Sequence, residues 1–133
     1  MALELTKDSI DLGIVIRDPE ASLAFYRDTL GFPMIGQAEL PGTTMYRLMC
    51  GTSMIKLLHP ASPPPAVAAP GGIPGAYGYR YWTISVSNIE EVTDACGQAG
   101  YKVVVPVRSI GPGITISIIE DPDGNWVELL KAG

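Results

Sequence analysis

The sequence predicts an α+β fold in which two similar modules form a cupped mixed sheet with helices on its outer side. Three observations predict it. The chain has 133 residues and a mass of 14.1 kDa, which is the size of a single domain. A stretch rich in proline and glycine divides it into two halves, and the halves repeat one pattern of apolar residues. We expect one domain, with module one at 8–59, a linker at 60–78 and module two at 79–131.

The first half predicts a strand, a helix and further strands. Apolar and polar or small residues alternate over 12–16, as in a strand that buries one face. Asp18 is expected to cap the helix that follows, and Gly31 to end it. Its apolar face contains Leu23, Tyr26 and Leu30. Strand-like runs then cover 45–50 and 53–58.

The second half repeats this order. Residues 82–86 alternate like the first strand, and Asn88 followed by Glu91 predicts a helix cap with a capping-box pair. Gly100 is expected to end this helix. Further strand-like runs cover 102–107, 114–119 and 126–130.

The repeat predicts how the halves pair. A shift of 70 residues aligns Leu12 with Trp82 and Asp18 with Asn88, and a shift of 72 aligns 55–58 with 127–130. A module this small needs a partner to form a stable core, so the two sheets should pair and line a shared trough. Such a trough is the natural ligand site. The linker is expected to be a stiff spacer or a loop over that site.

Composition excludes several classes of partner and location. Nine Lys and Arg against 14 Asp and Glu give a net charge of −5, without a basic run that could bind nucleic acid. No segment of about 18 apolar residues and no leader is present, so we expect a cytoplasmic protein that does not bind membranes. Cys50 and Cys96 lack metal-binding spacing and are expected to be buried thiols.

Strand parity predicts which side chains face the trough. Four polar residues have the parity opposite to their buried neighbours, and the repeat makes them equivalent in pairs: Asp11 with Tyr81, and Lys56 with Glu128. We expect these four to form one catalytic cluster. The predicted ligand-binding lining consists of Trp126, Thr83, Ser85 and Ser117.

Three segments carry a resemblance to a known family: LGIVIRDPEASLAFYRDTLGF at 12–32, WTISVSNIEEV at 82–92 and EDPDGNWVELL at 120–130. Their order and spacing resemble the vicinal oxygen chelate superfamily, which includes glyoxalase I, bleomycin-resistance proteins and extradiol dioxygenases. The resemblance implies paired βαβββ modules, a homodimer and a site inside the cupped sheet.

In catalytic members of that superfamily, four positions hold a divalent metal, and the motifs place those positions on Asp11, Lys56, Tyr81 and Glu128. The Lys56 ammonium would repel a dication, so the expectation is no metal and no other cofactor. His59 has the opposite strand parity and is expected to be a surface or packing residue.

The leading hypothesis is a metal-independent isomerase, epimerase or lyase acting on a small carbonyl compound. Glu128 or Asp11 would be the base, with a pKa raised by apolar surroundings, Tyr81 the acid or oxyanion donor, and Lys56 the electrostatic partner. The four groups could instead form a merely stabilising cluster.

Two other functions are open. One is a bleomycin-resistance-type protein that sequesters a drug or metabolite between aromatic walls. Those walls would be Trp126, Tyr77, Tyr79 and Tyr81, unless Trp126 fills a dimer seam while Tyr77 and Tyr79 anchor the linker. The other is an unconventional metal enzyme using Asp11, Glu128 and His59.

Overall fold

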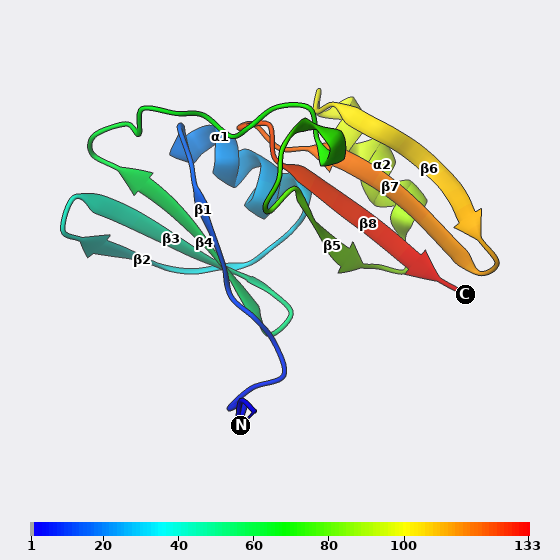
Figure 1. Ribbon diagram of the computed structural model, residues 1–133, viewed down its shortest axis with the longest axis horizontal. Coiled ribbons are helices and arrows are strands. Elements are labelled where there is room, and N and C mark those ends of the chain that lie inside the picture. The colour runs from blue at the N-terminus through cyan, green and yellow to red at the C-terminus, as the bar shows by residue number, and fades with distance from the viewer. Residues whose placement is uncertain (1) are drawn as a thin grey trace.

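The structure is a computed structural model that describes residues 2–133. It contains two four-stranded sheets, with strand orders β1-β4-β3-β2 and β5-β8-β7-β6 (Figure 1). The elements of module one are β1 (Leu12–Val15), α1 (Pro19–Leu23), η1 (Ala24–Thr29), β2 (Met34–Leu40), β3 (Thr43–Cys50) and β4 (Ser53–Pro60). The linker contains the short 3-10 helix η2 (Ile73–Gly75). Module two consists of β5 (Tyr81–Ser85), α2 (Ile89–Gln98), β6 (Val103–Gly111), β7 (Ile114–Glu120) and β8 (Trp126–Ala132).

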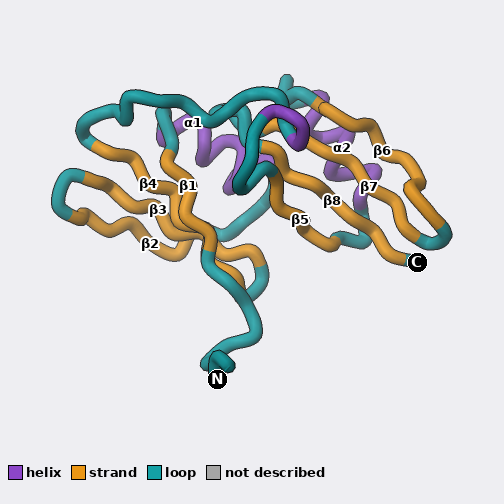
Figure 2. Tube along the Cα trace, in the orientation of Figure 1, coloured by secondary structure: helices purple, strands orange, loops and turns teal. Residues whose placement is uncertain are grey.

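The two modules have the same topology, which confirms the predicted α+β class. The first strand of each module is parallel to its last strand, and the remaining pairs are antiparallel. Figure 2 shows the strands as two separate sheets, with α1 between them in this view. Among residues 2–133, no helix is both long enough and apolar enough to span a membrane.

Strand β2 was not predicted from the residue alternation, although the βαβββ module implied by the family resemblance requires a strand there. It pairs antiparallel with β3 and contains a register shift between Met34 and Gly36. Gly36 and Ala38 occupy its half-buried positions, while Gln37 and Glu39 are exposed. Because the half-buried positions carry almost no apolar side chain, the alternation that marks the other strands is missing here.

The first predicted helix forms, but its second part is wound more widely than an α-helix. Asp18 caps it as predicted, because its Oδ1 accepts hydrogen bonds from the backbone nitrogens of Glu20 at 3.0 Å and Ala21 at 3.4 Å. In the π-helical part the Leu30 nitrogen bonds to the Phe25 carbonyl at 2.9 Å. Phe25 and Tyr26 are both fully buried, whereas the predicted apolar face included only Tyr26.

The cap predicted for the second helix is wrong. The Asn88 side chain accepts no backbone hydrogen bond. Its Nδ2 donates instead to Glu91 Oε2 at 3.4 Å. The predicted partner is therefore present, but the backbone amides at this helix start are left without a side-chain cap.

Apolar side chains of both modules pack into one cluster. Tyr26 of η1 stacks on Phe32 at 6.2 Å and on Trp82 of β5 at 6.3 Å between ring centroids. Phe25 meets Tyr101 edge-on at 4.8 Å. These aromatic contacts bury the helix-facing sides of the sheets and leave their other faces for a ligand.

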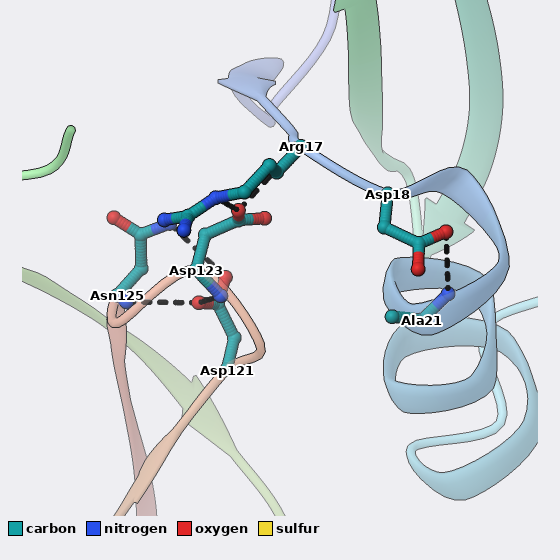
Figure 3. Close-up of polar contacts among 6 residues, drawn as sticks. All are labelled: Arg17, Asp18, Ala21, Asp121, Asp123 and Asn125. Carbon is teal, nitrogen blue, oxygen red and sulfur yellow. Dashed lines mark hydrogen bonds and ion pairs between the residues drawn. The ribbon is translucent and has the colours of Figure 1, made fainter. Parts of the chain in front are cut away.

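A buried hydrogen bond joins the modules at the turn between β7 and β8. Tyr26 Oη donates to Asp121 Oδ2 at 2.6 Å. The other oxygen of Asp121 accepts from the backbone nitrogens of Asp123 at 2.9 Å and Asn125 at 2.8 Å, so the same carboxylate shapes the turn (Figure 3). Burial, and then the charge of Asp121, raises the pKa of Tyr26 well above its usual value, so its hydroxyl stays a donor at neutral pH.

Asp123 makes a second contact between the modules at this turn. Its Oδ1 accepts a hydrogen bond from the Arg17 backbone nitrogen at 3.2 Å and lies 3.5 Å from Arg17 Nε (Figure 3). Its side chain is only 10% exposed, and its Oδ2 has no hydrogen-bond partner. Burial, and then the neighbouring charge of Asp121, raises the pKa of Asp123.

We predict that Tyr26→Phe lowers the free energy of unfolding by about 1–3 kcal/mol, because Asp121 loses a buried hydrogen-bond donor. Urea unfolding followed by circular dichroism measures it. Tyr46→Phe is the matched control, because Tyr46 makes no side-chain hydrogen bond within the described part of the chain. Equal losses in both variants would contradict a special role for the Tyr26–Asp121 bond.

The raised pKa of Asp123 predicts a pH-dependent stability difference. The folded protein holds this proton to a higher pH than the unfolded chain, so the stability contributed by Asp123 falls as pH rises from the unfolded pKa through the folded one. Asp123→Asn keeps an acceptor for Arg17 but cannot ionise. Its unfolding free energy relative to wild type should therefore rise as the pH increases from about 4, near the unfolded pKa, through the raised folded pKa. A difference that stays constant with pH would refute this assignment.

Candidate functional site

The face of each sheet that points away from the buried cluster is called here its open face. Residues paired directly across strands share a face, so the register defines it. On the first sheet, one row across the open face runs Gly13, Lys56, Arg47 and Gly36. On the second sheet, Thr83, Glu128 and Ile118 form such a row, and Tyr81 pairs with Trp126 in the next.

Asp11, just before β1, is surrounded by donors. Its Oδ1 accepts from Lys7 Nζ at 2.6 Å and from the Met54 backbone nitrogen at 3.2 Å, and its Oδ2 lies 3.9 Å from Lys56 Nζ. The hydrogen bond from Lys7, followed by that from Met54, lowers the pKa of Asp11. The predicted base with a raised pKa is therefore wrong for Asp11, because its carboxylate is held in the ionised form.

Glu128 has different surroundings on the second sheet. It is half-buried, and its Oε1 accepts a hydrogen bond from the Thr83 hydroxyl at 2.7 Å. Tyr81, Thr83 and Ser85 are exposed on the same open face. The second sheet thus presents a carboxylate among hydroxyl groups, without a cation bonded to it in residues 2–133.

The four predicted catalytic residues lie in two separate sets. Within residues 2–133, no hydrogen bond or ion pair joins Asp11 or Lys56 to Tyr81 or Glu128. Contacts between the modules run through Tyr26 and the turn before β8, not through the open faces. The predicted single cluster is not formed by direct contacts.

The residues at the superfamily's metal positions do not fit a metal ion. The Lys56 ammonium is close to the Asp11 carboxylate, and the row places a second cation, Arg47, directly opposite Lys56. His59 pairs with Thr44 and has the parity of the opposite face. The part of the chain that the structure describes contains no group of three His, Cys, Asp or Glu residues placed to hold a metal.

One predicted lining residue lies on the wrong face. Ser117 is fully buried, and its hydroxyl is 2.8 Å from Thr93 Oγ1 on α2. It pairs with Leu129, which faces the buried cluster. The parity was ambiguous because Ile116, Ile118 and Ile119 make both faces of β7 apolar.

Trp126 lies beneath the linker. The six-membered ring of its indole packs on Gly72, and a Cβ atom on that residue would overlap the ring. Arg80 holds this part of the linker, since its Nε donates to the Gly72 carbonyl at 2.6 Å and its Nη2 to the Ala69 carbonyl at 3.0 Å. The linker therefore folds over one end of the second open face, and its role as a loop over a binding site stays a prediction.

A cavity of about 220 Å³ opens between the linker and the start of β8. Its lining includes Tyr77, Tyr79, Arg80 and Trp126. Tyr77 and Tyr79 are fully exposed, so they do not anchor the linker by burial; that role falls to Trp126 and Arg80. No role was predicted for Arg80, although it lies between Tyr79 and Tyr81 in the sequence.

Solved structures with the same fold include a glyoxalase family protein from Bacillus cereus, with a TM-score of 0.82 at 18% identity over 98% of this chain and 96% of that one. A glyoxalase family protein from Enterococcus faecalis has a TM-score of 0.68 at 25% identity over 96% of each chain. TnmS3, an antibiotic-binding protein from Streptomyces sp. CB03234, has a TM-score of 0.69 at 18% identity over 100% of this chain and 99% of its own.

A comparison with curated proteins found no match. The model of the Glyoxalase/Bleomycin resistance protein/Dioxygenase superfamily matches residues 9–129, a range that begins before β1 and ends within β8. With the paired modules and the shared topology, this match establishes the family predicted from the sequence. The chain belongs to the Glyoxalase/Bleomycin resistance protein/Dioxygenase superfamily.

Proposed function

We propose that the protein binds a small organic molecule that contains an aromatic ring and carries an amine. The observation that carries the proposal is the cavity at the start of β8, whose lining includes Trp126 and the two exposed tyrosines Tyr77 and Tyr79. Aromatic side chains provide flat surfaces on which a ring can stack. A volume of about 220 Å³ suits one ring system, with the rest of the ligand lying on the open face.

Glu128 supports a positively charged group on this ligand. It lies two residues after Trp126 on β8, so both side chains point to the same face. Its carboxylate is oriented by the Thr83 hydroxyl and keeps a second oxygen for a ligand donor. The net charge of −5 also favours the approach of a cation.

The positive charge of Arg80 does not strongly repel a cationic ligand of this kind. Its guanidinium donates to the carbonyls of Gly72, Ala69 and Pro70, and it is therefore used to hold the linker. We infer that its role is to keep the cavity wall in place rather than to contact the charged group.

Binding without conversion is the better supported function of this site. TnmS3, a protein of the same fold, is an antibiotic-binding protein. The metal-independent isomerase, epimerase or lyase predicted from the sequence has weaker support, because Asp11 has a lowered pKa and does not contact Tyr81 or Glu128. A homodimer stays part of the proposal, since a second chain could cover the open faces.

The first prediction from this proposal concerns ligand charge. Tryptamine should shift the indole Nε1–Hε1 signal of Trp126 saturably in ¹⁵N-labelled protein, while its neutral analogue 3-ethylindole should bind about tenfold more weakly, because it cannot pair with Glu128. Glu128→Gln should remove that preference. Glu4→Gln, which removes the same charge from the exposed N-terminal segment, should preserve it.

Loss of the preference in Glu4→Gln as well would attribute it to net charge rather than to the site. Trp126→Phe identifies which of the two indole signals belongs to Trp126 and which to Trp82, the other tryptophan. No saturable shift of the Trp126 signal, with any arylalkylamine tested, would refute the cavity as the binding site.

The second prediction separates binding from catalysis. An aromatic ketone that carries an alkylamine, incubated with excess protein, should be recovered unchanged, as judged by NMR of the extracted compound. In deuterated water the hydrogens on the carbon next to its carbonyl should exchange no faster than without protein, because within residues 2–133 Glu128 makes no hydrogen bond to Tyr81, the acid that enolisation would need. Exchange abolished by Glu128→Gln would instead support the enzyme hypothesis.

A further inference from the structure

We propose that the open face of the first sheet carries a second binding site, in which Arg47 of β3 and Lys56 of β4 hold an oxyanion group of a small molecule. Carboxylate and phosphate groups share the chemistry that this pair would recognise. The site lies on a different sheet from the aromatic cavity and does not depend on it.

The strand register brings the two cations together. Arg47 and Lys56 are directly opposite each other in the antiparallel pair β3–β4. Side chains at such positions share a face, with Cβ atoms about 4.5–5.5 Å apart. Like charges in this arrangement repel and destabilise the sheet, and an anion between them would remove that repulsion.

Arg47 has no partner of its own. Within residues 2–133 its side chain makes no ion pair and no hydrogen bond, and its Nε is buried without an acceptor. A buried donor without an acceptor is unfavourable, and a guanidinium has five N–H groups to offer. This unused donor set is the observation that points to a missing acceptor.

The glycines at both ends of the row leave room for the pair. A Cβ atom on Gly36 would overlap the terminal guanidinium nitrogen of Arg47, so the side chain lies over Gly36 because that residue has none. Gly13, opposite Lys56 on the other side, is exposed and has only Leu58 within 4 Å of the position of a Cβ. The row therefore has no side chains at its two ends, and its two middle positions carry the cations Lys56 and Arg47.

Asp11 does not neutralise this patch. Its carboxylate is already bonded to Lys7 at 2.6 Å, while Lys56 stands farther away at 3.9 Å. Lys7 and Lys56 flank this one carboxylate, and Arg47 adds a third cation opposite Lys56, so the positive charges exceed the negative one by two in a chain whose net charge is negative. A local positive patch on an acidic protein favours anions at this place.

The test is a titration of the protein with inorganic phosphate and, separately, with acetate, at constant ionic strength maintained with chloride. The Nε–Hε signal of Arg47 in ¹⁵N-labelled protein should shift saturably with at least one of the two anions. A response to phosphate alone identifies a phosphate-type ligand, and a response to acetate identifies a carboxylate. Either response supports the site.

Three variants locate the binding. Lys56→Gln should weaken it about tenfold. Gly36→Ala keeps both charges but displaces the guanidinium, and should also weaken it; the backbone at Gly36 is not left-handed, so alanine is tolerated there. Arg108→Gln removes an exposed cation from the open face of the second sheet and should change the affinity less than about twofold.

No saturable shift at Arg47 with either anion would overturn the proposal. An equal loss of affinity in Arg108→Gln and Lys56→Gln would also overturn it, because binding would then follow net charge. If Lys56→Gln unfolds, Gly36→Ala decides alone: unchanged affinity in this variant rejects the role of the positioned guanidinium. Neither result affects tryptamine binding at the other sheet.

Discussion

The hydrogen bond between Tyr26 and Asp121 connects the two halves of the molecule at the point where the second sheet receives its last strand. The same carboxylate shapes the turn that leads into β8, so one buried group sets both the contact between the modules and the start of that strand. β8 carries Trp126 and Glu128. The geometry of the aromatic cavity therefore depends on the Tyr26–Asp121 hydrogen bond, which lies outside the cavity, on the helix-facing side of the sheet.

The two modules share a topology but not a surface chemistry. The open face of the first sheet presents Arg47 and Lys56, whereas that of the second presents Glu128 among hydroxyl and aromatic groups. A duplicated scaffold with unlike faces can recognise the two ends of an asymmetric molecule, which identical modules could not distinguish.

The fold could be predicted because strand alternation and the internal repeat depend on local sequence, and the parity of most strands followed from them. The site was harder to predict because its electrostatics depend on chain segments brought together by folding. The sign of the pKa shift of Asp11 is set by Lys7 and a backbone amide. Ser117 was misplaced because its strand is apolar on both faces. Arg47 was not among the predicted site residues. Its side chain lies over Gly36 of β2, and no residue alternation marked that strand in the sequence.

Arg80 fixes the length of chain that is free to connect the modules. Because it holds the carbonyl of Ala69, only the segment from Pro60 to Ala69 is left to span the distance between them. Nine residues reach at most about 30 Å when extended. Within residues 2–133 the modules also share one apolar cluster and the Tyr26–Asp121 bond, so this short tether adds to contacts that already hold them together. Only if those contacts broke would release of Arg80 matter, because it would roughly double the length of chain that lets the modules separate.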